Sequence, residues 1–262
     1  MNRGLERSSE KVLICMLLIV ATLSLLFCTT AGAYIYDDFS GAGINNTKWT
    51  VFDDNQLFSE PGDGQLYFSS TGAVPPPGAT LRSTSSFGPG FFSLDFNSFF
   101  SSNTSPGGQG LGSFAAIGLG TRDTTYVRML RGRVVSEQWG YFEANYFDGA
   151  DLHVWYIYAD ATSGQLGLSY DGSVVDFFYN DGINGWQELD VTGPDTKDRI
   201  LTVTPGWILQ PPMFVSGTPG STGVTSFAVD KVEVMPVPEP TTALLLVSGL
   251  IGLAGLRNRF KK

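Results

Sequence analysis

The chain has 262 residues, a formal net charge of −9 and a hydrophobic fraction of 42%. Between Tyr34 and Met235 the acidic excess is larger, with 22 acidic and 9 basic side chains. Nucleic-acid binders need clustered cations to displace counterions, so this composition argues against a nucleic-acid partner. Both cysteines, Cys15 and Cys28, lie in the apolar segment near the N-terminus. Disulfides, thiolate nucleophiles and cysteine-ligated zinc are therefore excluded from the rest of the chain.

The first 33 residues have the three-part pattern of a secretory signal peptide. A positively charged start is followed by a nearly unbroken apolar run over residues 12–27. Small residues at Ala31 and Ala33 then match the A-x-A pattern that signal peptidase reads. We expect cleavage after Ala33. The alternative is an uncleaved N-terminal anchor, because an apolar run of about 16 residues almost spans a bilayer.

Residues 34–235 are predicted to form one all-β domain. The segment is rich in glycine, serine, threonine and aromatic residues, and shows no amphipathic helix pattern of ten or more residues. Asp-Gly and Asn-Gly turn signals divide its alternating runs, most clearly at Asp171-Gly172. About fourteen strands in one domain indicate a sandwich or a barrel. The expected strands are Tyr34–Phe39, Trp49–Phe52, Gln65–Ser69, Ala79–Ser83, Phe91–Phe99, Phe114–Leu119, Tyr126–Leu130, Tyr141–Tyr146, Leu152–Ala159, Gln165–Tyr170, Val174–Tyr179, Gln187–Val191, Ile200–Val203 and Thr225–Val234.

Both ends of this β-rich segment resemble the concanavalin A-like lectin/glucanase superfamily. The opening residues 36–40, with residues 44–49, are similar to its first strand and following turn, and residues 227–234 are similar to its returning last strand. The resemblance implies an antiparallel β-sandwich, a concanavalin A-like jelly roll, in which the last strand pairs near the first. It also implies a concave surface that faces carbohydrate. A fold alone does not establish a function.

The carboxylate pattern of the catalytic members is absent. Glycosidases of this superfamily carry a Glu-x-Asp-x-x-Glu pattern on one strand, and the nearest segment here runs from Glu137 to Asn145. Glu137 and Glu143 share a strand face, but six residues of strand separate them by roughly 20 Å. Retaining hydrolysis needs about 5.5 Å. We therefore expect no catalytic residues and no enzyme; the alternative is a glycoside hydrolase or polysaccharide lyase with an unfamiliar site.

A glycan-binding face is the more specific hypothesis for this strand. Alternation within residues 139–146 places two aromatic rings, a carboxylate and an amide on one side. Sugars are typically held by an aromatic platform flanked by such polar groups. The alternative is an ordinary sandwich strand, with aromatic rings in the core and alternate polar residues in solvent. The candidate binding residues are Trp139, Tyr141, Glu143 and Asn145, with Asp95 and Asn97 as their neighbours.

No cofactor or metal is expected. The single histidine, His153, cannot build a histidine-rich metal site, and we expect it on a strand near the surface. The acidic excess could recruit a divalent cation such as calcium, but no motif supports a structural calcium site.

The C-terminal residues 236–262 combine three features. Pro238, Glu239 and Pro240 form a triplet, a small-residue-rich apolar stretch follows over residues 243–256, and a basic cluster ends the chain. This arrangement resembles the PEP-CTERM sorting signal of Gram-negative exported proteins. The resemblance implies recognition by an exosortase, a membrane-embedded cysteine transpeptidase that processes the tail near the triplet. The basic residues are Arg257, Arg259, Lys261 and Lys262.

Physical chemistry favours the same interpretation of the tail. The two prolines around Glu239 impose an extended backbone, which an enzyme can thread into its cleft. Residues 241–256 would form a helix of roughly 24 Å, short against a hydrocarbon core of about 30 Å. The cations after this transmembrane helix keep that end cytoplasmic. The alternative is an ordinary C-terminal anchor with an incidental triplet.

Together these features predict an exported, exosortase-processed protein of the cell surface or extracellular matrix. It would be tethered transiently to the inner membrane through its C-terminal helix and then reach the cell surface or the exterior. The central domain would bind a polysaccharide, such as an exopolysaccharide, without catalysis. A purely structural surface or adhesion protein is the other alternative.

Replacing Pro238, Glu239 and Pro240 with alanine should block release or surface display while leaving export through the inner membrane intact. The triplet is the expected processing signal, whereas the apolar stretch and the cations only hold it in place. Cell fractionation and the apparent mass of the protein would measure the effect. A triple variant that reaches the surface with normal size and yield would identify the tail as an ordinary anchor.

Overall fold

The computed structural model describes residues 33–70, 78–102, 113–121, 125–134, 139–189, 202–206, 210–219 and 223–236. The expected signal peptide ahead of Ala33, the sorting tail from Val237 onward and Glu137 lie outside these residues. Within them, no helix is long and apolar enough to cross a membrane.

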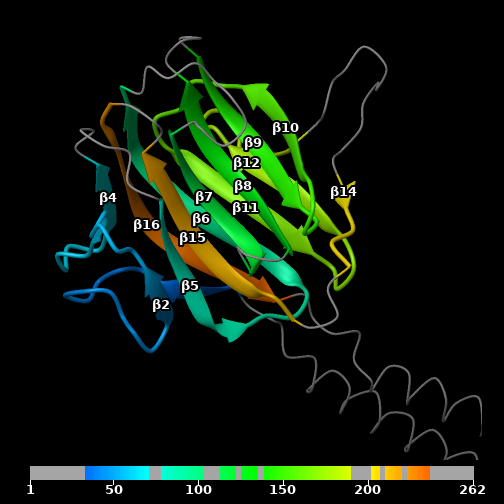
Figure 1. Cartoon of the computed structure of the whole chain (residues 1–262), viewed down its shortest axis with the longest axis horizontal. Helices are drawn as coiled ribbons and strands as arrows, with labels where there is room; N and C mark the ends of the chain where they lie inside the picture. Colours follow the sequence, from blue (N-terminus) through cyan, green and yellow to red (C-terminus); the bar gives the residue numbers. More distant parts are fainter. Residues whose placement is uncertain are drawn as a thin grey trace, which may run out of the picture. The chain divides into compact units, whose positions relative to one another are not determined.

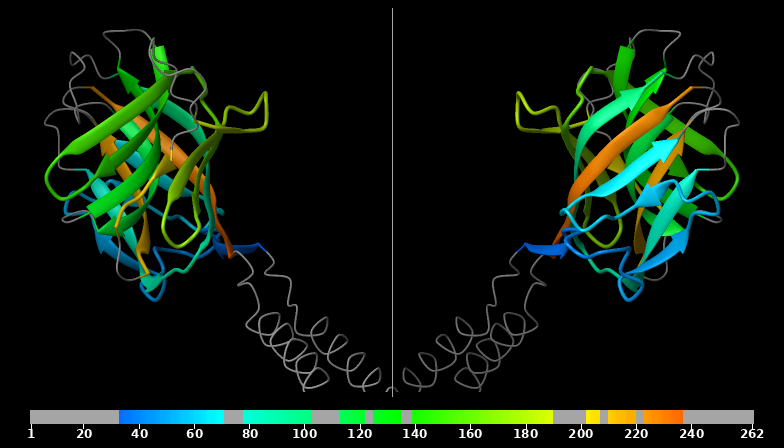
Figure 2. Two further views of the ribbon diagram at one scale, coloured as in Figure 1. Left: turned by 90° about the vertical axis from the view of Figure 1, so that its right-hand side faces the viewer. Right: turned by 90° about the vertical axis from the view of Figure 1, so that its left-hand side faces the viewer.

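Residues Ala33–Pro236 form one compact unit of two antiparallel sheets, seen as two curved layers in Figure 2. The described residues contain strands and turns but no helix. The larger sheet has nine strands in the order β13-β12-β11-β6-β16-β4-β3, with β1 also paired to β16 and β14 to β12. Its strands are β1 (Tyr34–Asp37), β3 (Phe58–Ser59), β4 (Leu66–Ser70), β6 (Gly90–Ser101), β11 (Gly164–Tyr170), β12 (Val175–Asn180), β13 (Trp186–Glu188), β14 (Thr202–Val203) and β16 (Thr225–Pro236).

The second sheet has seven strands in the order β10-β9-β8-β7-β15-β5-β2, and most of them lie side by side in Figure 1. Every strand pair in both sheets is antiparallel, so the prediction of an all-β antiparallel protein is confirmed. The strands are β2 (Trp49–Phe52), β5 (Ala79–Ser86), β7 (Ser113–Thr121), β8 (Thr125–Val134), β9 (Trp139–Phe147), β10 (Leu152–Tyr158) and β15 (Pro212–Pro219).

The hydrophobic core lies between the sheets and uses alternate residues of their strands. Leu94 and Phe96 of β6 are buried in it, and so are Phe142 and Ala144 of β9. The rings of Phe96 and Phe142 lie 6.4 Å apart, so β6 and β9 face each other across the core. The described residues of this core lie within the compact unit Ala33–Pro236.

Two details of the predicted topology are confirmed. The first strand pairs with the last, since Ile35 of β1 lies opposite Glu233 of β16. The Asp171-Gly172 turn joins β11 and β12 as an antiparallel hairpin. Gly172 has a φ of 107°, which side chains other than glycine rarely tolerate.

Two strands, β3 and β15, were not predicted from the sequence. Strand β15 begins at Pro212 and ends at Pro219, yet it lies between β7 and β5. Proline cannot donate a ladder hydrogen bond, so prolines at both ends favour a turn or an edge strand. The register shifts between Pro212 and Phe214, and this irregularity accommodates the first proline inside the sheet.

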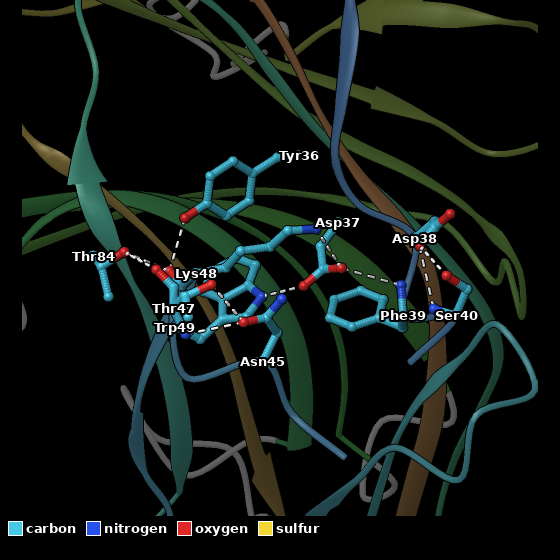
Figure 3. A network of polar contacts seen from close by, with 10 residues as sticks. All are labelled: Tyr36, Asp37, Asp38, Phe39, Ser40, Asn45, Thr47, Lys48, Trp49 and Thr84. Carbon is cyan, nitrogen blue, oxygen red and sulfur yellow. Dashed lines mark hydrogen bonds and ion pairs between the residues drawn. The ribbon is translucent and has the colours of Figure 1, made fainter. Parts of the chain in front are cut away.

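A buried carboxylate connects the first strands of the two sheets (Figure 3). Asp37 belongs to β1 of the nine-stranded sheet and accepts a 2.6 Å hydrogen bond from Nε1 of Trp49, in β2 of the seven-stranded sheet. It also pairs with Nζ of Lys48 at 3.1 Å and accepts from the backbone N–H of Phe39 at 3.3 Å. Tyr36 adds a 2.7 Å bond to the carbonyl of Lys48. The crossing from one sheet to the other is thus held by hydrogen bonds to one charged group.

Asp37→Asn should lower the free energy of unfolding by about 2 kcal/mol. The amide presents only one oxygen to three donors, and hydrogen bonds to buried charged groups contribute more than neutral ones. Urea unfolding of the segment 33–236 would measure the loss. The neighbouring Asp38→Asn is the matched control, because Asp38 is exposed and bonds only locally to Ser40. Equal effects of the two substitutions would contradict the role assigned to Asp37.

Candidate functional site

The outer face of the seven-stranded sheet carries the best candidate site, because one row of side chains crosses all seven strands there. Each residue of the row lies directly opposite the next one in the register of two neighbouring strands. It combines exposed aromatic rings at both ends with polar and apolar side chains between them. From β10 to β2 its residues are Tyr156, Glu143, Leu130, Ala116, Ser216, Thr80 and Phe52.

Glu143 is the first link of a hydrogen-bonded chain on this face. Its Oε1 accepts a 2.5 Å bond from Nδ2 of Asn145, and Oδ1 of Asn145 accepts a 2.6 Å bond from Nε of Arg128. Asn145 is fully buried, although it lies on the side of β9 that faces away from the core. The amide therefore holds a carboxyl and a guanidinium in fixed positions.

The environment of Glu143 favours its protonated form. Burial raises the pKa of Glu143 above its ordinary value, and the hydrogen bond from Asn145 and the charge of Arg128 only partly offset this rise. Desolvation disfavours the charged state of a carboxyl group wherever water is excluded. Glu143 can therefore donate as well as accept a hydrogen bond over a wider pH range than an exposed glutamate.

The floor of the site is apolar, which is unusual for the outer face of a sheet. Phe114, Ala116 and Leu130 are buried there and form a cluster separate from the core, with Tyr141 packed against it. The guanidinium of Arg128 lies 4.5 Å from the centre of the Phe114 ring, a distance typical of a cation–π contact.

A glycine makes room for the tyrosine on this floor. Gly132 lies directly opposite Tyr141 in the register of β8 and β9. A Cβ at Gly132 would overlap the ring of Tyr141, so only glycine lets that ring lie over the strand. The position of Tyr141 is therefore set by the backbone beneath it.

Exposed tyrosines border the floor on the β10 side. Tyr156 is 51% exposed and Tyr158 is 58% exposed. Their rings lie 5.4 Å apart edge to face, and the ring of Tyr156 lies 6.2 Å from that of Tyr141. Three tyrosine rings thus follow one another beside Glu143 and present both ring faces and hydroxyl groups.

A buried hydroxyl on the same row has no hydrogen-bond partner among the described residues. Ser216 lies two strands beyond Leu130 and is 6% exposed, and its Oγ makes no hydrogen bond there. Leaving a buried hydroxyl unsatisfied costs about 1–3 kcal/mol.

The structure brings together part of the predicted site. Tyr141, Glu143 and Asn145 share the outer face, while the intervening Phe142 and Ala144 are in the core, as the alternation predicted. Trp139 begins β9, but its side chain lies outside the described part of the structure.

The predicted neighbours Asp95 and Asn97 are not part of this site. Both lie on β6, in the other sheet, and point to its outer face because Leu94 and Phe96 fill the core. The two outer faces are on opposite sides of the sandwich. The prediction was wrong because alternation assigns a side chain to one face of its strand, but not the sheet to which the strand belongs.

Asp95 and Asn97 instead belong to a polar network on the nine-stranded sheet. Asp95 accepts a 2.7 Å bond from Gln165 and pairs with Lys231 at 3.6 Å, and Asn97 donates a 2.7 Å bond to Asp230. Burial raises the pKa of Asp95, while Gln165 and Lys231 counteract this rise. These side chains satisfy one another across neighbouring strands.

Several members of the site were not identified from the sequence, namely Arg128, Tyr156, Tyr158 and Ser216. The first three lie within strands that were predicted, and alternation there separates the two faces. What was missing was the pairing of β8, β9 and β10, which makes their outer faces continuous. Ser216 lies on β15, which was not predicted.

The arrangement is suited to binding through stacking and hydrogen bonds. Among the described residues of the crossing row and of the hydrogen-bonded chain, Glu143 is the one carboxyl group. No group of three or more His, Cys, Asp or Glu side chains in the described ranges could hold a metal ion. His153 lies on the exposed edge strand β10, with its Nε2 3.3 Å from Asp148.

Comparison with known proteins supports the fold and leaves the activity open. The chain matches no protein-family model and none of the curated proteins in sequence. Its structure resembles a beta-glucanase of Bacillus licheniformis, with a TM-score of 0.52 and 11% identity, over 79% of this chain and 99% of that one. It equally resembles an immunostimulatory antigen and pseudo beta-1,3-glucanase of Mycobacterium tuberculosis, with a TM-score of 0.52, 14% identity and coverage of 77% and 97%.

A third similar structure is a GH43 protein of Bacillus licheniformis, in a mutant form. The TM-score is 0.55 at 13% identity, and the match covers 77% of this chain but only 39% of the longer GH43 chain. Identities this low establish a shared glucanase-like jelly-roll sandwich and nothing about chemistry.

Glu143→Gln should change the pH dependence of stability in a defined direction. Because the pKa of Glu143 is raised in the folded state, its favourable contribution is complete below the ordinary value near 4.5. That contribution is lost as the pH rises through the folded-state pKa. The unfolding free energy of the native chain minus that of the variant should therefore fall across this window, by at most about 1.4 kcal/mol per pH unit.

Urea titrations of both proteins between about pH 4 and pH 8 would measure this difference. Subtracting the unfolding free energy of the variant from that of the native chain cancels the contributions of Asp95 and the other acidic groups, which the two proteins share. A difference that stays constant or rises with pH would contradict a raised pKa of Glu143 in the folded protein.

Proposed function

We propose that this protein is an exported protein of the cell surface or extracellular matrix whose concanavalin A-like sandwich binds a glycan without cleaving it. The binding surface is the outer face of the seven-stranded sheet. The observation that carries this proposal is the set of tyrosine rings beside the Glu143–Asn145–Arg128 chain. Aromatic rings stack on the C–H faces of sugars, and carboxyl and guanidinium groups, held in place here by the buried Asn145 amide, match the sugar hydroxyls.

The shape of the site suits a chain-like ligand. The crossing row extends from Tyr156 on β10 to Phe52 on β2, roughly 29 Å at the usual spacing between strands. Both end residues are exposed, whereas Ser216 and Thr80 between them are buried hydroxyls. A polysaccharide lying across the strands would meet an aromatic ring at each end, with Glu143 beside the ring of Tyr156.

The absence of cleavage is proposed from the carboxyl groups. Glycoside hydrolysis uses two carboxyl groups, about 5–5.5 Å apart in retaining enzymes and about 6.5–9.5 Å apart in inverting ones. Glu143 has no second carboxyl beside it among the described residues of the site. One of the similar structures is called a beta-glucanase and another a pseudo beta-1,3-glucanase. Both names make polysaccharides the first ligands to test.

A hydrolase or a polysaccharide lyase is the second candidate, and one observation favours it. Glu143 is half-buried, and desolvation raises its pKa, which suits a general acid that protonates a leaving oxygen. Release of new reducing ends or of unsaturated products from a panel of polysaccharides would separate the two functions. Product formation that Glu143→Gln abolishes would replace the binding proposal with catalysis.

Export and sorting are proposed from the two ends of the sequence alone. The signal peptide ending at Ala33 and the tail around Pro238, Glu239 and Pro240 make exosortase the expected processing enzyme. A glycan-binding domain retained at the cell surface or in a matrix would act where polysaccharides are present. A purely structural or adhesion role would require the same export but no polysaccharide affinity.

Tyr156→Ala should remove most of the affinity for polysaccharide while leaving the thermal midpoint nearly unchanged. An exposed ring contributes little to folding but much to stacking on a sugar. We expect weak binding, with a dissociation constant nearer millimolar than nanomolar, or about −4 kcal/mol. Affinity electrophoresis of the segment 33–236 in gels containing neutral or acidic polysaccharides would measure it.

Phe100→Ala is the matched control for this experiment. Phe100 is 50% exposed, close to the exposure of Tyr156, and lies on β6 of the other sheet. Its removal should leave the affinity unchanged. Equal losses in the two variants, or no retardation by any polysaccharide, would overturn the proposed binding face.

A further inference from the structure

Strand β10 is a long edge of the seven-stranded sheet. It is the last strand of that sheet among those described (Figure 1), and it has seven residues. The strands that end the sheets elsewhere are much shorter: β2 has four residues, β13 three, and β3 and β14 two each. Short edge strands limit pairing with other chains, and β10 lacks this protection.

The phase of the ladder shows which backbone groups of β10 point outward. The N–H of Ala159 donates to the carbonyl of Gly140 at 2.9 Å, so this facing pair is a hydrogen-bonded one. Hydrogen-bonded and non-hydrogen-bonded pairs alternate along an antiparallel ladder. The backbone groups of Trp155 and Ile157 therefore point toward β9. Those of Val154 and Tyr156 point away from it, at the edge of the sheet.

The other usual means of protecting an edge are also absent from β10. The strand carries no lysine, no proline and no acidic residue. Its register with β9 runs without a bulge from Leu152 to Tyr158. A regular strand of this length without lysine, proline or carboxylate side chains is a template for pairing with a further strand.

We propose that β10 pairs antiparallel with β10 of a second copy of this chain, with the two-fold axis at Trp155. In that register the outward backbone N–H and C=O groups of Val154 face those of the partner's Tyr156. Each such pair of residues can exchange two hydrogen bonds. The side chains also match, because an aliphatic residue meets an aromatic ring across the junction, a favourable cross-strand pair. This self-complementarity is the reason for choosing a second copy as the occupant.

Acidic residues at the ends of the strand regulate this association. Asp151 precedes β10 and Asp160 follows it, and both are exposed. In the proposed register Asp151 faces the partner's Ala159 and lies next to the partner's Asp160, which is already paired with Arg131 at 3.4 Å. The negative charge of Asp151 therefore remains unbalanced and opposes pairing at both ends. Salt screens such exposed charges, with a screening length of about 30 Å at 0.01 M and about 3 Å at 1 M. The dimer should therefore strengthen as the salt concentration rises.

Pairing in this way would join two seven-stranded sheets into one continuous surface. The crossing row of one copy would continue, through Tyr156, into the partner's Val154 on the same outer face. Only this consequence rests on the proposed glycan binding. A polysaccharide chain would then meet two binding faces at once, which raises avidity without new contacts.

The oligomeric state of the segment 33–236, measured by sedimentation equilibrium at about 0.01 M and about 1 M salt, tests the proposal. The native protein should form a dimer that is tighter at high salt. Val154→Pro should raise the dimer dissociation constant by at least about tenfold, because proline removes an outward N–H that the monomer does not use. Monomers at every concentration and at both salt levels would overturn the proposal.

Val51→Pro is the matched control, on the opposite edge of the same sheet. The N–H of Thr84 donates to the carbonyl of Lys48 at 2.8 Å, so the N–H of Val51 also points outward from β2. This variant should dimerise normally. If both proline variants dimerise more weakly than the native protein, or if neither does, the dimer interface is not at β10 and the proposed pairing is rejected.

Two further variants keep the test decisive. Near-UV circular dichroism will show whether the Val154→Pro variant is folded. If it is not, Val154→Lys is used instead, because lysine keeps the backbone N–H at position 154 and places a charge at the junction. It should also give monomers, and a dimer of normal strength would reject the pairing. Tyr156→Ala keeps its outward N–H and should still dimerise, so loss of glycan binding and loss of dimerisation are distinguished by different substitutions.

Discussion

Most of this structure depends on one constraint: two sheets share one hydrophobic core, and each strand contributes every second residue to it. Phe142 and Ala144 must enter the core, where the Phe142 ring meets Phe96 of the other sheet. Glu143 and Asn145 are then forced onto the outer face, because successive side chains of a strand point to opposite sides. A shift of one residue would bury both polar side chains between the sheets and expose the aromatic ring.

The outer face of the seven-stranded sheet differs from an ordinary solvated face because it has an apolar floor of its own. Phe114 and Leu130 are buried there, on the side of the sheet opposite to the core. Water is excluded from the groups beside them, and this exclusion raises the pKa of Glu143. The same surroundings make the Asn145 amide necessary, since it links the carboxyl to Arg128. The floor thus supplies both the shape of the candidate site and its electrostatic character.

The two sheets are also tied together outside their core. Asp37 connects β1 to β2 through Trp49, whose ring packs against Tyr36 at 5.1 Å and is almost completely buried. A buried carboxylate is stable only with such donors around it. The residues that resemble the opening of the lectin and glucanase domains therefore have a structural role here. Binding, by contrast, is assigned to strands in the middle of the chain.

The sequence by itself determined the strand content, the hairpin at Asp171-Gly172, the pairing of the first strand with the last, and the two faces of β9. The strand content, the hairpin and the two faces of β9 are local properties, or follow from a periodicity of two residues, so neighbouring residues suffice to predict them. The pairing of the first strand with the last is not local, and it was expected only from the resemblance to the lectin/glucanase superfamily. Strand β15 was missed because prolines at both of its ends obscure the local pattern. Only the bulge after Pro212 admits it to the sheet.

Only the tertiary structure decided which strands lie side by side, and hence which residues form the site. Arg128 and Arg131 belong to the same strand, yet one lies over Phe114 on the outer face and the other is buried against Phe99, with its pKa lowered to about 10 by desolvation. Alternation separates the two residues but does not say which side is the core. Asp95 was assigned to the wrong sheet, because alternation does not say which strands become neighbours. The choice depends on contacts between strands far apart in the chain, where burial of the larger apolar area determines which face turns inward.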